Sequence, residues 1–193
     1  MIGSTTRQID IDAGRDNAAG NITNTNSNNT YEIVMAGDGS PIAAWMASLA
    51  EEIRTDKYVS EFVDTLQMYT QRLTHDGIDG LEAKLKHAGR ASDVSLAFRK
   101  KELFTRLLAR YSMFDSAQQI FAYLLSKVEQ DFRAYVMPHL GSYTDADVDR
   151  LFAEYVISPC ATEIKSGVFC LNSAIAAGMV YWLAEQCYIR WHR

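Results

Sequence analysis

The chain has 193 residues, of which 48% are apolar and 22% are charged, a composition usual for one soluble domain with a hydrophobic core. Its net charge of −5 excludes a protein that binds nucleic acid or an anionic membrane through overall charge alone. Length and composition therefore leave room for a single globular domain with an appendage.

Residues 1–40 differ sharply in composition from the rest of the chain. They are rich in asparagine, glycine and threonine, which is typical of disorder. However, residues 8–12 alternate polar and apolar side chains, and the unit at 13–18 is echoed at 19–24, as in short β-structures. Two such units cannot bury a core, so neighbouring chains would have to complete them. Both interpretations stay open, a disordered linker or a β-oligomerisation segment, and the candidate self-association residues are Ile9, Ile11, Gly14, Gly20 and Ile22.

Residues 41–193 show apolar side chains at intervals of three and four residues, the period of amphipathic helices. Ser40 and Pro41 form a cap and first helical residue, Ser92 and Thr144 are further caps, and Pro138 predicts the end of a long helix. The predicted helices cover about residues 41–54, 57–69, 79–89, 92–111, 114–136, 144–157 and 174–187, with one more turn or helix beginning at Ser158-Pro159.

Two segments near the C-terminus need separate interpretation. Residues 167–184 carry no charge, but Asn172 and Ser173 divide them as a helix cap, and the helix that remains is too short to cross a bilayer. The last residues alternate, with Ile189 and Trp191 on one face, which predicts a short buried C-terminal strand. The sequence thus predicts a mainly α protein, a multi-helix bundle that ends in this strand.

No pattern in the sequence indicates catalysis or a bound cofactor or metal. The segment Gly37–Gly39 lacks the lysine of a phosphate-binding loop. The residues Asp145, Asp147 and Asp149 are spaced as in a calcium loop, but the required glycine and glutamate are missing, so we interpret them as acidic residues at a helix N-terminus. We therefore predict that the chain is not an enzyme and needs no cofactor.

The three cysteines are Cys160, Cys170 and Cys187, and each lies in an apolar stretch. Their spacings match no zinc site, and nothing in their positions supports a pair with a histidine that would activate a nucleophile. We expect them to be reduced, buried side chains, which predicts a cytoplasmic protein.

One predicted helix carries a run of basic residues, moderated by Asp93 and Glu102. Such a run is usually a solvated face, but it is also a candidate contact for phosphate or an acidic partner. Aromatic residues of the kind that stack on single strands are not interleaved there. An alternative function is therefore a nucleic-acid-binding regulatory domain, and the candidate residues are Arg99, Lys100, Lys101, Arg106 and Arg110.

Several stretches of the predicted bundle occur together, in order and at matching distances, in one known family. They are Gly80–Leu85, Phe104–Leu125, Gly178–Leu183 and Cys187–His192, and the segment Gly14–Asp16 with Gly20–Asn21 is similar to the linker ahead of that domain. In these stretches the chain resembles the C-terminal domain of effector subunits in ABC-three-component systems, the Lamassu-type bacterial anti-phage machines.

The resemblance implies a non-catalytic module that assembles effector chains and docks them to an SMC-like ATPase and a small middle component. Nucleic acid would then be contacted only indirectly. Family members usually carry an effector enzyme, often a nuclease, ahead of this domain. Here Met1 precedes the linker almost directly, so we expect the effector to be a separate polypeptide unless the chain was cut from a longer protein.

We also expect the isolated chain to form a dimer or tetramer. Residues 1–40 have too little apolar surface to fold alone, and the bundle of residues 41–193 is rich in aromatic side chains. Both features are explained if copies of the chain associate with one another.

Overall fold

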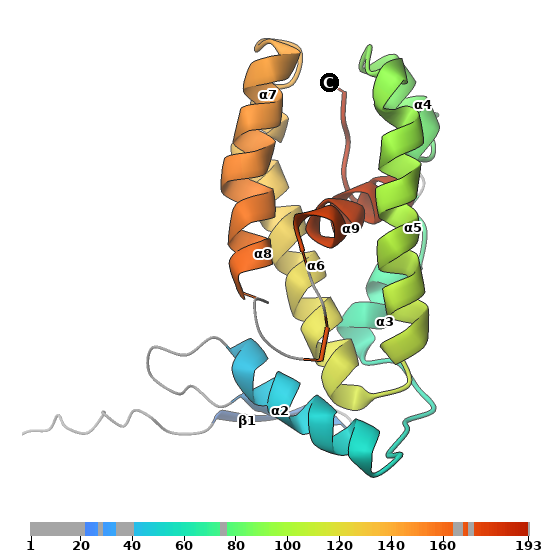
Figure 1. The fold of residues 1–193 in the computed structure, drawn as a ribbon, viewed down its shortest axis with the longest axis vertical. Coiled ribbons are helices and arrows are strands. Elements are labelled where there is room, and N and C mark those ends of the chain that lie inside the picture. The colour runs from blue at the N-terminus through green and yellow to red at the C-terminus, as the bar shows by residue number, and fades with distance from the viewer. Residues whose placement is uncertain are drawn as a thin grey trace, which may run out of the picture. The chain divides into compact units, whose positions relative to one another are not determined.

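The computed structural model of the protein describes residues 22–26, 29–33, 41–73, 77–163, 168–169 and 172–192 (Figure 1). The chain divides into two units, residues 1–44 and 45–193. Its described part is mainly helical, as predicted. The helices are α2 (Pro41–Arg54), α3 (Asp64–Thr70), α4 (Leu81–His87), α5 (Val94–Tyr111), α6 (Asp115–Tyr135), α7 (Asp145–Leu151), α8 (Ser158–Glu163) and α9 (Ser173–Glu185), with the short 3-10 turns η2 (Ala91–Asp93) and η3 (Met137–His139) and the π-helix η4 (Phe152–Ile157).

In the first unit the structure describes a β-hairpin. Strands β1 (Ile22–Asn26) and β2 (Asn29–Ile33) pair antiparallel, with Ile22 opposite Ile33. The high strand propensity of isoleucine, threonine and tyrosine offsets the low strand propensity of asparagine in these two segments. The candidate residue Ile22 begins β1. The other candidates for self-association lie outside the described residues, as does the unit at 13–18: these are Ile9, Ile11, Gly14 and Gly20.

The second unit is a helical bundle built around α6. This helix packs against α3, α5, α8 and α9, and its bounds agree with the predicted helix at 114–136 to within one residue at each end. Phe121 of α6 meets Phe104 of α5 edge to face, with ring centroids 5.9 Å apart, a favoured aromatic geometry. The buried face of α6 includes Ala117, Ile120, Phe121, Leu124, Leu125, Val128 and Phe132, the three-to-four spacing of one helix face.

The predicted cap of α9 is confirmed. The side-chain oxygen of Asn172 accepts hydrogen bonds from the backbone N–H groups of Ala174 and Ile175, at 2.9 and 3.1 Å. The cap satisfies two of the donors that every helix start leaves open. Among the described residues, no helix combines the length and apolar character that a membrane crossing requires.

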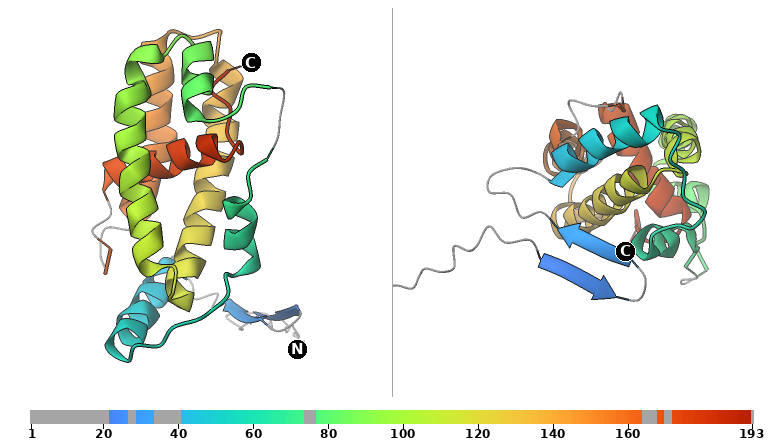
Figure 2. Two further views of the ribbon diagram at one scale, coloured as in Figure 1. Left: turned by 90° about the vertical axis from the view of Figure 1, so that its right-hand side faces the viewer. Right: turned by 90° about the horizontal axis from the view of Figure 1, so that it is seen from below.

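Helix α9 crosses α5, as the left view of Figure 2 shows for the red and yellow-green helices, and the two helices are in close contact. The contact is made at Gly178. A Cβ atom built there would lie 2.2 Å from the carbonyl oxygen of Lys100 and 3.1 Å from Cβ of Phe104. A distance of 2.2 Å is far inside the packing limit of protein interiors, so only glycine allows the two backbones to approach this closely.

Helices α4 and α9 also complete each other's ends. The carboxylate of Glu185, the last residue of α9, accepts a hydrogen bond of 3.0 Å from the N–H of Leu81, the first residue of α4. In return, the Nζ of Lys84 donates a 2.6 Å hydrogen bond to the carbonyl oxygen of Ala184. Both bonds place a charge at the helix end of opposite partial charge. We call these two bonds the α4–α9 clasp.

The predicted helix at 57–69 begins only at Asp64, because side-chain bonds hold the preceding segment in an irregular form. The buried amide of Gln118 accepts from the N–H of Val63 at 2.7 Å and donates to the carbonyl of Glu61 at 3.1 Å. The N–H of Val59 donates to the carbonyl of Met113 at 2.8 Å. Three backbone groups of this segment are therefore hydrogen-bonded without a helical turn.

The helix that begins at Thr144 continues through Pro159 as one column of α7, η4 and α8 (Figure 1). The predicted cap is confirmed: the Thr144 hydroxyl accepts a 3.2 Å hydrogen bond from the N–H of Asp147. Proline has no N–H for a helical bond and its ring clashes with the carbonyl four residues earlier. The wider π turn accommodates it, with the N–H of Ser158 bonded to the carbonyl of Ala153, five residues back.

Residues 188–192 do not form the predicted strand. They follow α9 through turns and bends, and the N–H groups of Tyr188 and Ile189 donate to the carbonyl of Leu183 rather than to a neighbouring strand. The burial that was predicted for this segment is confirmed, since Ile189 and Trp191 are 0% and 2% exposed. The alternation of polar and apolar residues marked which side chains are buried, but it did not distinguish a strand from an irregular segment.

Candidate functional site

Helix α5 presents a row of side chains to solvent on the side away from the core. Its buried residues are Ala97 and Phe104. Five exposed positions follow one another at intervals of three or four residues, which places them on one face of the helix. We call this row the α5 stripe, and it consists of Leu96, Arg99, Leu103, Arg106 and Arg110.

The leucines of the α5 stripe are unusually accessible for apolar side chains. Leu96 is 56% exposed and Leu103 is 46% exposed. Single exposed leucines are common on protein surfaces, but these two stand two helical turns apart on the same face, with Arg99 between them. Apolar side chains that share one exposed helix face with charged residues offer a surface that another protein can cover.

The structure divides the five predicted basic residues into two groups. Arg99, Arg106 and Arg110 lie on the α5 stripe. Lys101 lies elsewhere on the helix, with its Nζ 3.5 Å from the carboxylate of Glu185 and 4.5 Å from the centroid of the Phe98 ring. Lys100 is half-buried, and its carbonyl belongs to the crossing with α9. The side chain of Lys101 and the backbone of Lys100 are therefore part of the bundle's own packing.

The α5 stripe keeps an excess of positive charge. Arg106 donates a 3.0 Å hydrogen bond to Glu102, but both side chains are largely exposed, so this pair contributes little to stability and is easily exchanged. Within the part of the chain that the structure describes, Arg99 and Arg110 form no ion pair. Two guanidinium groups are thus available to an acidic partner.

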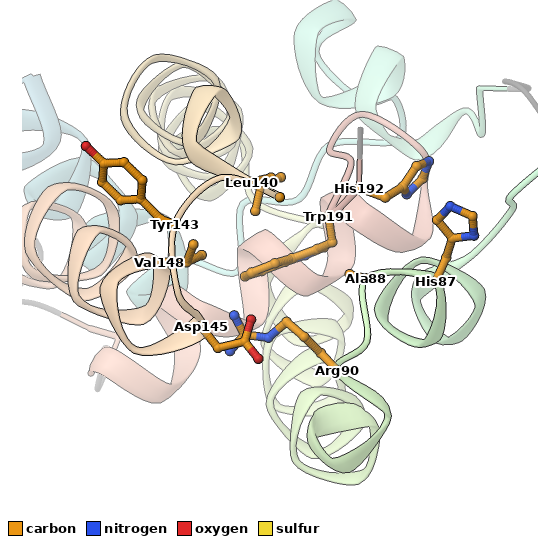
Figure 3. A pocket seen from close by; sticks show the side chains of 10 residues that line it. His87, Ala88, Arg90, Leu140, Tyr143, Asp145, Val148, Trp191 and His192 are labelled. Carbon is orange, nitrogen blue, oxygen red and sulfur yellow. The ribbon is translucent and has the colours of Figure 1, made fainter.

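A pocket of about 350 Å³ lies where α4, the loop before α7 and the C-terminal segment meet (Figure 3). Arg90 and Trp191 lie side by side there, with the guanidinium carbon 5.3 Å from the ring centroid. Arg90 also pairs with Asp93 at 2.9 Å and with Asp149. The charge of Arg90 is therefore matched within the fold, and we assign it to anchoring the C-terminal segment.

The acidic residues around α7 have structural roles. Asp145 and Asp147 lie in the first turn of the helix, which confirms their interpretation as helix N-terminal residues. Asp149 instead reaches Arg90. Within the described residues, no group of three side chains is arranged to hold a metal ion.

Two titratable side chains with shifted pKa values have roles within the fold. Burial raises the pKa of the Cys160 thiol to about 12, so this cysteine stays protonated and unreactive at neutral pH. Burial disfavours the charged form of Glu185 and acts to raise the pKa of its carboxyl. The hydrogen bond from Leu81 and the charge of Lys101 are among the interactions that outweigh burial, and they hold this pKa below its usual value. Cys170 lies outside the described residues.

Two polar residues in the stretches that carry the family resemblance have roles that the sequence did not reveal. Lys84 is 2% exposed and belongs to the α4–α9 clasp, and Gln118 is 1% exposed and holds the segment before α3. Their positions on the apolar faces of α4 and α6 were a usable signal. Buried polar groups need specific partners, so these residue types are required by the packing.

The described geometry is that of a helical domain with an exposed, positively charged apolar face. The family model for C-terminal domain 9 of the ABC-three component (ABC-3C) systems matches residues 80–191, from the start of α4 to Trp191. The match covers more than half of the chain, and the chain belongs to this family. No curated protein and no solved structure matches the chain.

Family membership confirms the resemblance that the sequence stretches indicated. The matched segment begins at Gly80, directly ahead of α4, and leaves α2 and α3 outside it. A component of a multi-component system has protein partners. The α5 stripe lies entirely within the matched segment.

Proposed function

We propose that the chain is a non-catalytic docking and oligomerisation module of an anti-phage defence complex of the Lamassu type. In this proposal it connects an effector enzyme with an SMC-like ATPase and a middle component in the cytoplasm. The observation that carries the proposal is the family match over residues 80–191. The exposed α5 stripe supports it, because a docking module needs a face that its own fold does not cover.

The proposal predicts that the chain forms a stable complex with the ATPase and the middle component of its own system. When the three are co-expressed, we expect them to elute together in size-exclusion chromatography. Light scattering should give the peak a mass equal to that of a complex containing all three proteins. A matched control replaces this chain by the bundle of an unrelated helical protein. If the ATPase and the middle component elute without the chain at micromolar concentrations, the docking role is wrong.

The oligomerisation role is assigned to residues 1–40, including the candidates Ile9, Ile11, Gly14, Gly20 and Ile22. An isolated two-stranded hairpin is marginal in water, so pairing between chains would supply the bonds that one copy lacks. Deleting residues 1–40 is expected to reduce a dimer or tetramer to a smaller species. Circular dichroism should show the helices of residues 45–193 retained, because that unit has its own core. An oligomer of unchanged size in light scattering would mean that the segment is only a linker.

A further inference from the structure

We infer that the α5 stripe is the docking face for an acidic amphipathic helix of a partner protein. This inference rests on the proposed docking function and deepens it, because it names the face and the chemistry of the partner. The partner helix would carry an apolar row flanked by aspartate or glutamate side chains. Three observations carry the inference: the spacing of the stripe, its charge, and its separation from the core.

The spacing of the stripe fits another helix. Leu96 and Leu103 are seven residues apart, and Arg99 and Arg106 continue the same face at alternating intervals of three and four. This is the period at which two helices pack along a shared seam. The two leucines would enter the spaces between apolar side chains of the partner, and this burial would remove their exposed surface from water.

The charge of the stripe specifies an acidic partner. Arg99 and Arg110 have no ion pair within the described part of the chain, and Arg106 has an exposed one with Glu102 that can be exchanged. Guanidinium groups bind carboxylates through paired hydrogen bonds of defined geometry. The stripe is also a positive feature on a chain of net charge −5, so a complementary acidic surface would be oriented towards it during association.

The same features argue against two other binding partners for the stripe, a second copy of this chain and a nucleic acid. A second copy of the stripe would bring arginines opposite arginines across a two-fold contact, which is repulsive. A nucleic acid backbone would gain from Arg99 and Arg110, but it would cover Leu96 and Leu103 with phosphates and sugars and lie beside the carboxylate of Glu102. A protein helix with apolar and acidic residues satisfies both kinds of side chain.

The stripe can be altered without disturbing the bundle. The core contacts of α5 are made by Ala97 and Phe104 and by the crossing at Gly178. The side chains of the stripe point away from these contacts, as their exposure shows for Leu96 and Leu103. Substitutions there are expected to leave the unfolding temperature unchanged, so that a loss of binding reports on the surface itself.

The test uses the full chain with the immobilised complex of ATPase and middle component, measured by biolayer interferometry. Two double variants alter the stripe, Arg99→Glu with Arg110→Glu, and Leu96→Gln with Leu103→Gln. We expect each to weaken binding by about 100-fold or more, as for central residues of an interface. Matched controls make the same changes at exposed positions elsewhere, Arg54→Glu with Arg150→Glu, and Met68→Gln with Met113→Gln. These controls are expected to bind within about threefold of the unaltered chain.

A photo-crosslinker at position 103 identifies the surface that covers the stripe. We expect the crosslinked peptide to come from the ATPase or the middle component and to carry acidic residues beside an apolar row of helical spacing. A peptide without acidic residues would overturn the inference about the partner's chemistry.

The outcomes separate the inference from the proposed function. If the unaltered chain binds and both stripe variants bind equally well, the docking function stands and the α5 stripe is not the docking face. If the unaltered chain does not bind, the docking function itself is overturned. Salt-dependent binding of the isolated chain to a DNA duplex, abolished by Arg99→Glu with Arg110→Glu, would assign the stripe to phosphate and contradict the inference.

Discussion

Replacing Gly178 by alanine is expected to lower the free energy of unfolding by about 3 kcal/mol or more. In a helix interior, alanine is normally more stabilising than glycine by up to about 1 kcal/mol. The expected change in stability therefore has the opposite sign to the change that helix propensity alone would give. The reason is the Cβ position 2.2 Å from the carbonyl oxygen of Lys100, a backbone atom that moves only if α5 moves. Urea unfolding followed by circular dichroism measures the change.

A matched control separates the lack of space from the loss of a glycine. Gly77 has a φ of +79°, and nothing lies within 4 Å of its Cβ position, so Gly77→Ala adds backbone strain of about 1–2 kcal/mol without a clash. Gly178→Ala should therefore cost more than Gly77→Ala, although the helix at Gly178 suits alanine better. If Gly178→Ala is as stable as Gly77→Ala, or more stable, then α5 and α9 are further apart than the distances at Gly178 indicate.

Replacing Trp191 by alanine is expected to cost about 3–5 kcal/mol, the range for a fully buried aromatic side chain. The indole is 2% exposed, and its ring centroid lies 5.0 Å from that of Phe132 and 5.3 Å from that of Phe152. The substitution also removes the aromatic surface beside Arg90, which adds to the loss of burial. A thermal unfolding curve reports the effect as a lowered melting temperature.

The control for this prediction is an exposed aromatic residue of the same end of the bundle. Tyr143 is 48% exposed, so Tyr143→Ala should change stability by no more than about 0.5 kcal/mol. The loss of stability in Trp191→Phe should lie between those of Trp191→Ala and Tyr143→Ala, because phenylalanine keeps a smaller buried aromatic ring. A melting temperature that Trp191→Ala leaves unchanged would show that the C-terminal segment is loosely attached.

Much of the bundle could be predicted because the signals that form it are local. The apolar spacing of α6, the asparagine at the start of α9 and the threonine at the start of α7 each act within one or two helical turns. The basic residues of α5 were found in the same way. Lys100 and Lys101 are set apart from the exposed stripe by contacts with α9. No local pattern in the sequence indicates these contacts.

The incorrect predictions have long-range causes. The segment before α3 is irregular because Gln118, more than 50 residues later in the chain, binds its backbone. The C-terminal segment is held by ring packing around Trp191. In each case a tertiary contact decides between local conformations of similar energy.

The α4–α9 clasp has a consequence for the way the protein is made. Its two hydrogen bonds join residues 100 and 104 positions apart in sequence, so the first helix of the matched family segment is completed by the last. During synthesis α4 leaves the ribosome long before Ala184 and Glu185 exist. Until then Lys84 must stay hydrated, since burying its charge without the α9 carbonyl is costly. The final packing of this domain therefore follows the translation of α9, because contacts between residues this far apart in sequence form late.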